Sequence, residues 1–426
     1  MSEAALGIDI GTSGVRAVLL GRDGDILAMS QTAMMLPQQS FGRLWQDARV
    51  WAAAMDEVLL GLKAKFKEHQ VLALAIDGTS GTILPVDGNG APIELASMYN
   101  DVADEKFLLA VMEAAPQDTA ARGGSSPLAR ALEMQNKAGV TRILHQADWL
   151  AGRFSGHFDV SDENNALKTG YDPVKQIWPA WIKDTGLKMA LLPEVVAAGE
   201  RTSTILTAVA DRYGLPRDVA IVAGTTDGCA AFLASGASAP GDGVTSLGTT
   251  LTLKLLSDRP VFAPEYGIYS HRIGGQWLAG GASNSGGAAL AAYFDHNDIV
   301  RLTPLIDPGH PTGLDYYPLP KPGERFPIND PTMASRAAPK PDDERLFFQG
   351  LLEGIAGVEA LGYRRLAELG ATPLKTLRTV GGGAANKPWT RIRERLLKIA
   401  SQPPLSEHAA VGTARLAWRG IGHDPY

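Results

Sequence analysis

Three aspartates lie at or beside the ends of short apolar runs, and a glycine follows each within two residues. They are Asp9, Asp77 and Asp227. A carboxylate in such a place can bind Mg²⁺, a hard cation that prefers oxygen ligands, or accept the proton of a reacting hydroxyl. Aspartate is also common as a turn or helix cap, so residue type alone leaves both roles open for each. The same ambiguity holds for Ser80, which closely follows Asp77.

Three turns of small residues could bring backbone amides close to a phosphate. Gly11–Gly14 and Gly248–Thr250 each separate two apolar runs. Amides in such turns bind phosphate, and nearby hydroxyls add donors, although a lone example is more often an ordinary hairpin turn. Two of them facing each other across a cleft would clamp a phosphate chain. Gly381–Gly383 is a third opening for a nucleotide, and none of the three fits the P-loop or the dinucleotide-binding pattern.

Sheets are needed to position these residues. Apolar runs predict strands over 5–10, 15–20 and 26–29, a helix over 47–67, and a buried strand over 71–76. The opening strand–turn–strand pattern recurs over 244–256, where Leu247–Thr250 aligns with Ile10–Ser13. A repeat at the start of two similar-sized halves favours a duplicated architecture.

The remaining elements follow from periodicity and glycine or proline breaks. The segment 102–215 has a mostly helical pattern, and a strand over 219–223 runs into a helix over 229–234. Pro240–Gly243 is typical of a boundary between lobes. Beyond it we predict strands over 275–279 and 377–380, helices over 285–294, 346–369, 387–399 and 407–418, and a long loop over 304–343.

Composition excludes several classes of protein. A chain of 426 residues with 45% hydrophobic and 20% charged residues is globular and too long for one core. Its net charge of −6 and lack of a dense basic run argue against a nucleic-acid partner. Its apolar runs are shorter than the ~18 residues that span a bilayer, and its first residues do not resemble a signal peptide. With Cys229 as the single cysteine and no paired histidine spacing, we expect a cytoplasmic protein without disulfides, zinc or a membrane partner.

Several motifs occur together in the order typical of one family. Leu6–Arg16 resembles the first phosphate motif of the FGGY-type carbohydrate kinases, Ser246–Thr250 resembles the second, and Gly381–Asn386 resembles the adenosine motif. Three more segments are similar to the family's stretches before and around its catalytic aspartate: Gln146–Leu150, Asn164–Asp172 and Gly224–Gly228. The likeness runs from about residue 5 to residue 419, and the combination is far more specific than any single turn.

The resemblance implies an α/β fold. Two ribonuclease-H-like lobes, as in the actin-like ATPases, would flank a deep cleft, with the sugar deep inside and ATP between the lobes. The N-terminal, sugar-binding lobe is expected to comprise residues 1–234, with 408–426 returning to it. The C-terminal, nucleotide-binding lobe is expected to comprise residues 235–407.

The resemblance also implies roles for individual residues. Asp227 would be the catalytic base. The implied substrate-binding residues are Asp9, Thr12, Asp77, Ser80 and Asp227. The implied ATP-binding residues are Gly11, Thr12, Ser13, Gly248, Thr249, Gly286, Gly382, Gly383 and Asn386. ATP is the implied co-substrate, and Mg²⁺ would be held by Asp9 directly or through water.

Departures from the family pattern bear on the substrate. Ala103 stands where many relatives have an arginine, and Arg130 stands at the expected position of a lysine. The chain is also short, like the compact subgroup similar to the D-ribulose kinases of cyanobacteria and plants, some of which are named xylulose kinases. We therefore expect ATP-dependent phosphorylation of a free ketopentose at its terminal hydroxyl, with D-ribulose giving D-ribulose 5-phosphate. A D-xylulose kinase and a catalytically silent ATP-binding regulatory protein stay open as alternatives, and the oligomeric state is undetermined.

Overall fold

The computed structural model describes residues 1–424, which form two compact α/β units. The first unit contains residues 1–234, 271–275 and the chain from 408 onward, and the second contains residues 235–270 and 276–407. These bounds differ from the expected lobes only in the short segment 271–275, which groups with the first unit.

The first unit is built on a six-stranded sheet. Its strand order is β12 (Arg201–Thr204), β13 (Ala220–Thr226), β6 (His69–Gly78), β1 (Ser2–Ile10), β2 (Gly14–Gly21) and β3 (Ile26–Ala33). The predicted antiparallel meander β1–β2–β3 is confirmed, and β1, β6 and β13 run parallel to one another. The carboxyl ends of these three strands therefore lie at one edge of the sheet.

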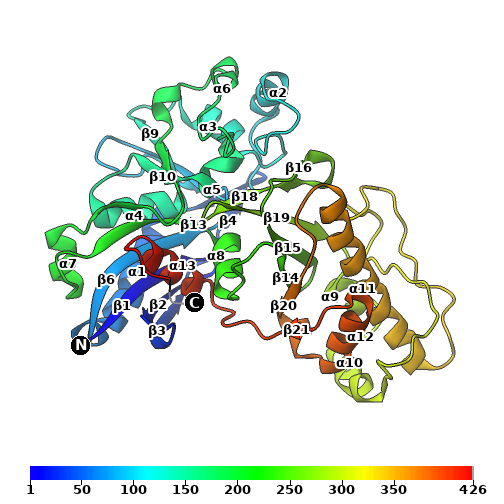
Figure 1. The fold of residues 1–426 in the computed structure, drawn as a ribbon. Coiled ribbons are helices and arrows are strands. Elements are labelled where there is room, and N and C mark those ends of the chain that lie inside the picture. Colours follow the sequence, from blue (N-terminus) through cyan, green and yellow to red (C-terminus); the bar gives the residue numbers. More distant parts are fainter. Residues whose placement is uncertain (425–426) are drawn as a thin grey trace. The chain divides into compact units, whose positions relative to one another are not determined.

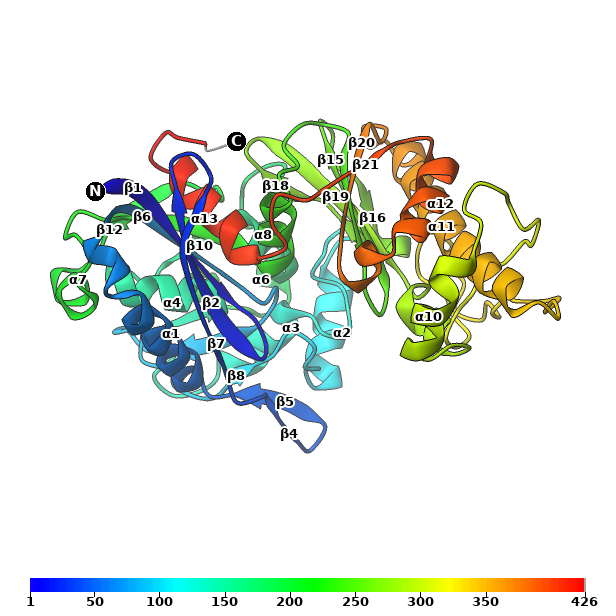
Figure 2. The same cartoon turned by 90° about the horizontal axis from the view of Figure 1, so that it is seen from below.

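Helices cover both faces of this sheet, as Figures 1 and 2 show for α1 and α13. The helices on one face are α1 (Ala48–Leu62) and α4 (Gln146–Ser155), and those on the other are α8 (Asp227–Ala234) and α13 (Ala409–Arg419). Side chains alternate along β1, so Leu6 and Ile8 join the core under α1 while Ala5 packs under α13. A Cβ on Gly7 would lie 2.1 Å from the carbonyl oxygen of Ala410, so only glycine lets α13 lie this close to β1.

A smaller sheet and several short elements complete the first unit. The smaller sheet has the order β4 (Gln38–Ser40), β5 (Arg43–Gln46), β8 (Ala96–Ser97), β7 (Ile83–Val86) and β9 (Arg142–His145). The other elements are α2 (Glu105–Ala114), α3 (Pro127–Met134), α5 (Glu163–Ala166), α6 (Trp181–Asp184), α7 (Thr207–Tyr213), β10 (Val160–Asp162) and β11 (Glu194–Val196). The expectation of a mostly helical stretch over 102–215 missed the strands β9 to β12, because three or four residues are too few to show a period.

The second unit repeats the pairing pattern of the first. Its main strands lie in the order β19 (Gln276–Ser283), β15 (Leu251–Ser257), β14 (Asp242–Leu247), β20 (Thr376–Val380) and β21 (Ser401–Gln402). β14 pairs with β15 antiparallel and with β20 parallel, as β1 pairs with β2 and β6. This shared topology supports the duplicated architecture inferred from the repeated turn.

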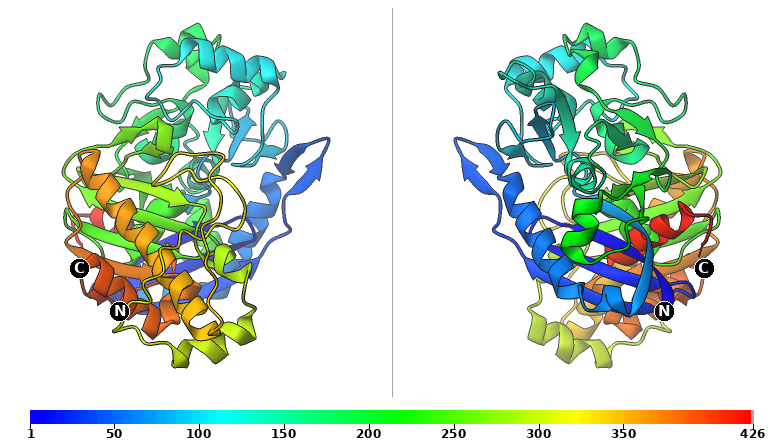
Figure 3. Two further views of the ribbon diagram at one scale, coloured as in Figure 1. Left: turned by 90° about the vertical axis from the view of Figure 1, so that its right-hand side faces the viewer. Right: turned by 90° about the vertical axis from the view of Figure 1, so that its left-hand side faces the viewer.

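Two helices contribute side chains to the hydrophobic core of the second unit and lie side by side in Figure 3. They are α11 (Glu344–Glu368) and α12 (Lys387–Leu397). The shorter elements are β16 (Phe262–Ala263), β17 (Ile268–Tyr269), α9 (Gly287–Ala291) and α10 (His296–Leu302), and β18 (His271–Ile273) lies in the segment grouped with the first unit. Between residues 306 and 343 the described chain contains no named helix or strand, so the predicted long loop is confirmed. Within residues 1–424, no helix has the length and apolar character needed to cross a membrane.

Candidate active site

The three aspartates singled out in the sequence converge at one edge of the first unit's sheet. Asp9 is the register partner of Asp77, and Asp77 is in turn the partner of Thr225 on β13. Asp227 directly follows β13 and begins α8. The register of β13 shifts between Val222 and Thr225, which indicates a bulge where the chain turns towards Asp227.

Burial and the repulsion between neighbouring carboxylates raise the pKa values of Asp9 and Asp77 at this edge of the sheet. Burial raises the pKa of Asp77 well above its ordinary value, and the negative charge of Asp9 raises it further. Burial also raises the pKa of Asp9, although a hydrogen bond with Asp77 and the charge of Arg16 oppose the shift. The side chain of Thr413, on α13, hydrogen-bonds Asp77 Oδ2. Two adjacent buried carboxyls cannot both ionise easily, which is the physical reason why the pKa values of Asp9 and Asp77 are both raised.

The turn after β1 forms the rim of a pocket beside Asp9. The Gly11 amide donates to the Gly14 carbonyl oxygen at 3.0 Å, which closes the turn. The pocket has a volume of about 430 Å³, and Asp9, Gly11, Ser13 and Arg16 are among its lining residues. Thr12 belongs to the same turn but not to the pocket lining.

The segment after β6 presents polar atoms that lack partners within the described chain. Ser80 Oγ is buried and has no hydrogen-bond partner among residues 1–424, and the same is true of Asp77 Oδ1. The first residue of α4, Gln146, reaches this segment and accepts hydrogen bonds from the amide and hydroxyl of Thr79 at 2.9 and 2.8 Å. This contact could not be predicted from a local pattern, because 67 residues separate the two positions.

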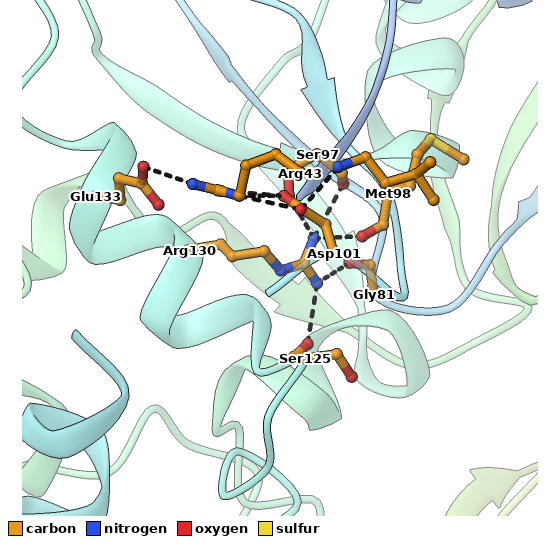
Figure 4. A network of polar contacts seen from close by, with 9 residues as sticks. Arg43, Gly81, Ser97, Met98, Asp101, Ser125, Arg130 and Glu133 are labelled. Carbon is orange, nitrogen blue, oxygen red and sulfur yellow. Dashed lines mark hydrogen bonds and ion pairs between the residues drawn. The ribbon is translucent and has the colours of Figure 1, made fainter. Parts of the chain in front are cut away.

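Arg130 fixes the backbone around Ser80. Its guanidinium is fully buried and donates to the carbonyl oxygens of Gly81, Ser97, Met98 and Ser125 (Figure 4). Burial lowers the pKa of Arg130 to about 10. This residue was noted in the sequence only as a departure from the family's lysine, whereas the structure shows it tying four loop carbonyls together.

A second arginine, Arg43, pairs with Asp101, two residues before Ala103. Arg43, on β5, donates to both carboxylate oxygens of Asp101 and forms an ion pair with Glu133 at 2.8 Å (Figure 4). The Ser97 hydroxyl donates to Asp101 and accepts from Arg130, so it connects Arg130 with the ion pair of Arg43 and Asp101. The negative charge of Asp101 is thus neutralised by Arg43, which is 58 residues away in the sequence.

Asp9 is suited to Mg²⁺ as a single carboxylate ligand. No group of three or more Asp, Glu, His or Cys side chains that could hold a metal occurs within residues 1–424. Mg²⁺ bound to a nucleotide commonly takes one or two carboxylates and completes its shell with phosphates and water. The carboxylate of Asp9, beside the pocket and the Gly11–Gly14 turn, fits that arrangement.

In the second unit, the second Gly-Thr turn is braced by the start of α9. The Gly287 amide donates to the Gly248 carbonyl oxygen, and the Ala288 amide donates to that of Thr249, both at 2.9 Å. Gly286 has a φ of 130°, and a Cβ there would lie 2.8 Å from the Thr250 carbonyl carbon. Glycine is therefore required where this segment passes under the turn.

The three-glycine segment borders a pocket of about 790 Å³ in the second unit. Gly381 and Gly382 line it, together with Ala384 and Ala385 and residues of α12. Gly383 instead packs against Leu247 and Trp389, where a Cβ would lie within 3 Å of both side chains.

Asn386 has a structural role in this region. Its side chain caps α12 by accepting from the Trp389 amide at 3.0 Å, and it donates to the Thr303 hydroxyl. Asn386 is not among the residues that line the pocket.

Models of one family match both halves of the chain. The N-terminal domain of the FGGY family of carbohydrate kinases matches residues 4–111, and the C-terminal domain of that family matches residues 243–421. A curated xylulose kinase of Lactococcus lactis subsp. lactis is 23% identical over 404 residues, covering 89% of this chain and 80% of the relative.

Solved structures share the fold at low sequence identity. A crystal structure of a xylulose kinase from Brucella ovis has a TM-score of 0.87 at 22% identity and covers 99% of this chain and 92% of that one. A gluconate kinase structure from Lactobacillus acidophilus has a TM-score of 0.84 at 18% identity and covers 99% and 90%. Both likenesses establish the actin-like ATPase fold, and the different sugars in their names show that the fold alone does not select a substrate.

Proposed function

This chain belongs to the FGGY family of carbohydrate kinases and is a sugar kinase, and we propose that its substrate is a free ketopentose. In the proposed reaction the γ-phosphoryl group of ATP passes to the terminal hydroxyl of the sugar, and D-ribulose gives D-ribulose 5-phosphate and ADP. The convergence of Asp9, Asp77 and Asp227 beside a turn of small residues is the observation that supports phosphoryl transfer at this edge. The choice of a ketopentose rests on the resemblance of this short chain to the compact D-ribulose kinase subgroup.

Asp227 is the proposed general base. Its carboxylate takes the proton of the attacking hydroxyl while the new O–P bond forms and the bond between the γ-phosphorus and the leaving oxygen of ADP breaks. The position of Asp227 at the start of α8, directly after a buried strand, holds its backbone firmly.

The remaining site residues are proposed to bind and orient the two substrates. Asp77 and Ser80 would contact sugar hydroxyls, and Asp9 would hold Mg²⁺ directly or through water. The metal, when bound, neutralises charge on the phosphates. The proposed phosphate-binding turns are Gly11, Thr12 and Ser13 in the first unit and Gly248, Thr249 and Gly286 in the second. Gly382, Gly383 and Asn386 are proposed to contact or shape the site for adenosine.

D-Xylulose is the second candidate substrate, because the curated relative from Lactococcus lactis described above is named xylulose kinase. The two ketopentoses differ in the configuration of one hydroxyl. ADP production should be measured with D-ribulose, D-xylulose, gluconate and glycerol, and a kcat/KM highest for D-ribulose would support the proposal. A higher value for D-xylulose would replace the substrate, and no ADP with any sugar would favour a silent ATP-binding protein.

The role of Asp227 is tested by Asp227→Asn. We expect kcat to fall by about 10²- to 10⁴-fold, the usual contribution of a general base, while ATP binding measured by calorimetry is retained. Asp211→Asn is the matched control, since this aspartate lies at an exposed position in the same unit and pairs with Arg217. Turnover retained by Asp227→Asn would remove this residue from the mechanism.

A further inference from the structure

Gln146 carries a buried hydrogen-bond donor that the protein leaves unused. The residue has no exposed surface, and its Nε2 has no hydrogen-bond partner within residues 1–424. Buried side-chain amides in native proteins nearly always pair both ends, because an unpaired polar group loses its hydration without compensation. A donor left open at this place therefore needs a physical reason.

The orientation of the Gln146 amide is fixed by its neighbours. Oε1 accepts from the Thr79 backbone amide at 2.9 Å and from the Thr79 hydroxyl at 2.8 Å. Rotating the amide by 180° would set its NH₂ group against the Thr79 N–H, donor against donor. The hydrogen-bond network therefore assigns Nε2, with its two protons, to the side away from Thr79.

The surroundings cannot easily move to satisfy this donor. Thr79 Oγ1 lies 2.6 Å from Thr82 Oγ1. The backbone N–H of Gln146 donates to the Thr82 carbonyl oxygen at 3.1 Å. Arg130 holds the neighbouring Gly81 carbonyl oxygen at 2.6 Å, as drawn in Figure 4. A Cβ on Gly78 would lie only 3.0 Å from Gln146 Oε1, so the backbone and the side chain are in close contact.

Two further unpaired polar atoms belong to the same short segment. Asp77 Oδ1 and Ser80 Oγ are buried and also lack partners in the described part of the chain. Together with Gln146 Nε2 they offer a carboxyl oxygen, a hydroxyl and a double donor around Gly78–Ser80. A ligand with several hydroxyl or carbonyl oxygens matches this set, since each oxygen accepts and each hydroxyl also donates.

We propose that Gln146 is a substrate-binding residue whose Nε2 donates to a sugar oxygen other than the one that is phosphorylated. The inference rests on the proposed function, because it takes the sugar to bind beside Asp77 and Ser80. It extends that function by naming a residue that distinguishes sugars by one oxygen. Within residues 1–424 no protein atom pairs this donor, and the sugar oxygen would pair it on binding.

The test compares sugars that differ by a single oxygen. Starting from whichever sugar the wild-type enzyme phosphorylates, kcat/KM is measured for the parent and for analogues that each lack one non-reacting oxygen. Wild-type enzyme should lose about tenfold with one of these analogues. Gln146→Met should show a similar loss with the parent sugar and no further loss with that analogue, while KM for ATP is unchanged.

Two additional variants separate recognition from folding. Gln146→Glu keeps an oxygen for Thr79 and, in its ionised form, offers no donor, so at a pH above the pKa of the new carboxyl it should lose the same discrimination even where the methionine variant folds poorly. Gln135→Met is the control, because Gln135 is a half-buried glutamine of the same unit that makes two hydrogen bonds, and it should discriminate as wild type does.

One result would overturn the proposal. If both Gln146 variants retain the wild-type ratio between parent and every analogue, Gln146 only supports the Thr79 backbone. That outcome is distinguishable from failure of the ketopentose proposal, which is decided by the sugars the wild-type enzyme accepts. A sugar other than a ketopentose would change the analogues used and leave the Gln146 comparison in place.

Discussion

At the scale of single residues, the buried carboxyl of Asp77 should give the protein a measurable pH dependence. Burial and the charge of Asp9 raise its pKa above the ordinary 3.8, so the folded state binds its proton more tightly than the unfolded chain does. The stabilisation from this proton is full below the unfolded pKa and is lost as the pH rises through the folded pKa. Asp77→Asn cannot ionise, so its free energy of unfolding should rise relative to wild type from about pH 4 upward.

The difference should grow by about 1.4 kcal/mol for each unit that separates the two pKa values, and thermal unfolding from about pH 2 to about pH 9 measures both this difference and its control. Asp47→Asn is the opposite control. The hydrogen bond from Arg49 lowers the pKa of Asp47, so the advantage of the wild type over this variant should shrink as the pH falls through the lowered pKa. A flat profile for Asp77→Asn would show that Asp77 is ionised throughout.

Residue type and position at strand ends were sufficient to select Asp9, Asp77 and Asp227 from the sequence, because parallel strands bring their carboxyl ends to one edge. The same reasoning could not find Gln146 or Arg130. Gln146 bonds Thr79, which is 67 residues away in the sequence, and Arg130 bonds Met98, which is 32 residues away. No local sequence pattern records a contact between segments so far apart. For Asn386 the family resemblance implies a nucleotide contact, and the hydrogen bonds of this residue show a helix cap that the sequence analysis did not predict.

At the scale of elements, Arg130 on α3 should control the loop that carries Ser80. Arg130→Lys keeps the charge, but a single ammonium cannot reach the carbonyls of Gly81, Ser97, Met98 and Ser125 together. We expect the free energy of unfolding to fall by about 2–4 kcal/mol and KM for the sugar to rise more than KM for ATP.

Urea unfolding and steady-state kinetics measure the two effects of the Arg130 change. Arg122→Lys is the control, because Arg122 donates to the carbonyls of Met112 and Ala115 from a less buried position in the same unit. An Arg130→Lys variant with wild-type stability and an unchanged sugar KM would contradict the positioning role.

The close contact between β1 and α13 is the second element-scale feature with a clear consequence. Gly7→Ala would place a Cβ against the backbone of Ala410 and Ala414, so α13 must move away and draw Thr413 from Asp77. We expect a loss of about 3 kcal/mol in unfolding free energy from this overpacking, together with reduced turnover. In Gly88→Ala, where a Cβ would meet no atom within 4 Å, both quantities should stay near wild type. Equal melting temperatures for the two variants would contradict the packing argument.

At the scale of the whole molecule, the two units repeat one topology and differ in their buried polar groups. The second unit contains a fully buried ion pair, Arg393–Glu359, in which Arg393 Nε lies 2.6 Å from Glu359 Oε2. The Thr245 hydroxyl, which is itself hydrogen-bonded to Tyr363, donates to Glu359 Oε1. The repeated strand–turn–strand pattern made the duplication readable from the sequence. The ion pair was not readable, because its partners lie on different helices, α11 and α12, and a charged residue in a helical pattern is usually exposed.

This division into units predicts that the two substrates protect different segments from hydrogen exchange. The sugar alone should slow exchange at the amides of residues 77–82 and at the start of α4, since it is proposed to contact Ser80 and Gln146. A non-hydrolysable ATP analogue alone should slow exchange at residues 248–250 and 381–386 of the second unit, and also at the proposed phosphate-binding turn 11–13 of the first unit. Ligand binding raises the cost of local opening by RT ln(1 + [L]/Kd), so protection of about 100-fold is expected near 100 times the Kd.

The amides of α7 in the first unit and α10 in the second are internal references, because neither helix lies among the proposed contacts. Protection of 77–82 by the nucleotide alone, with 381–386 unchanged, would reverse the proposed assignment of substrates to units. Uniform slowing across both units would instead show that binding stabilises the whole chain without a localised site, which would remove support for both turn assignments.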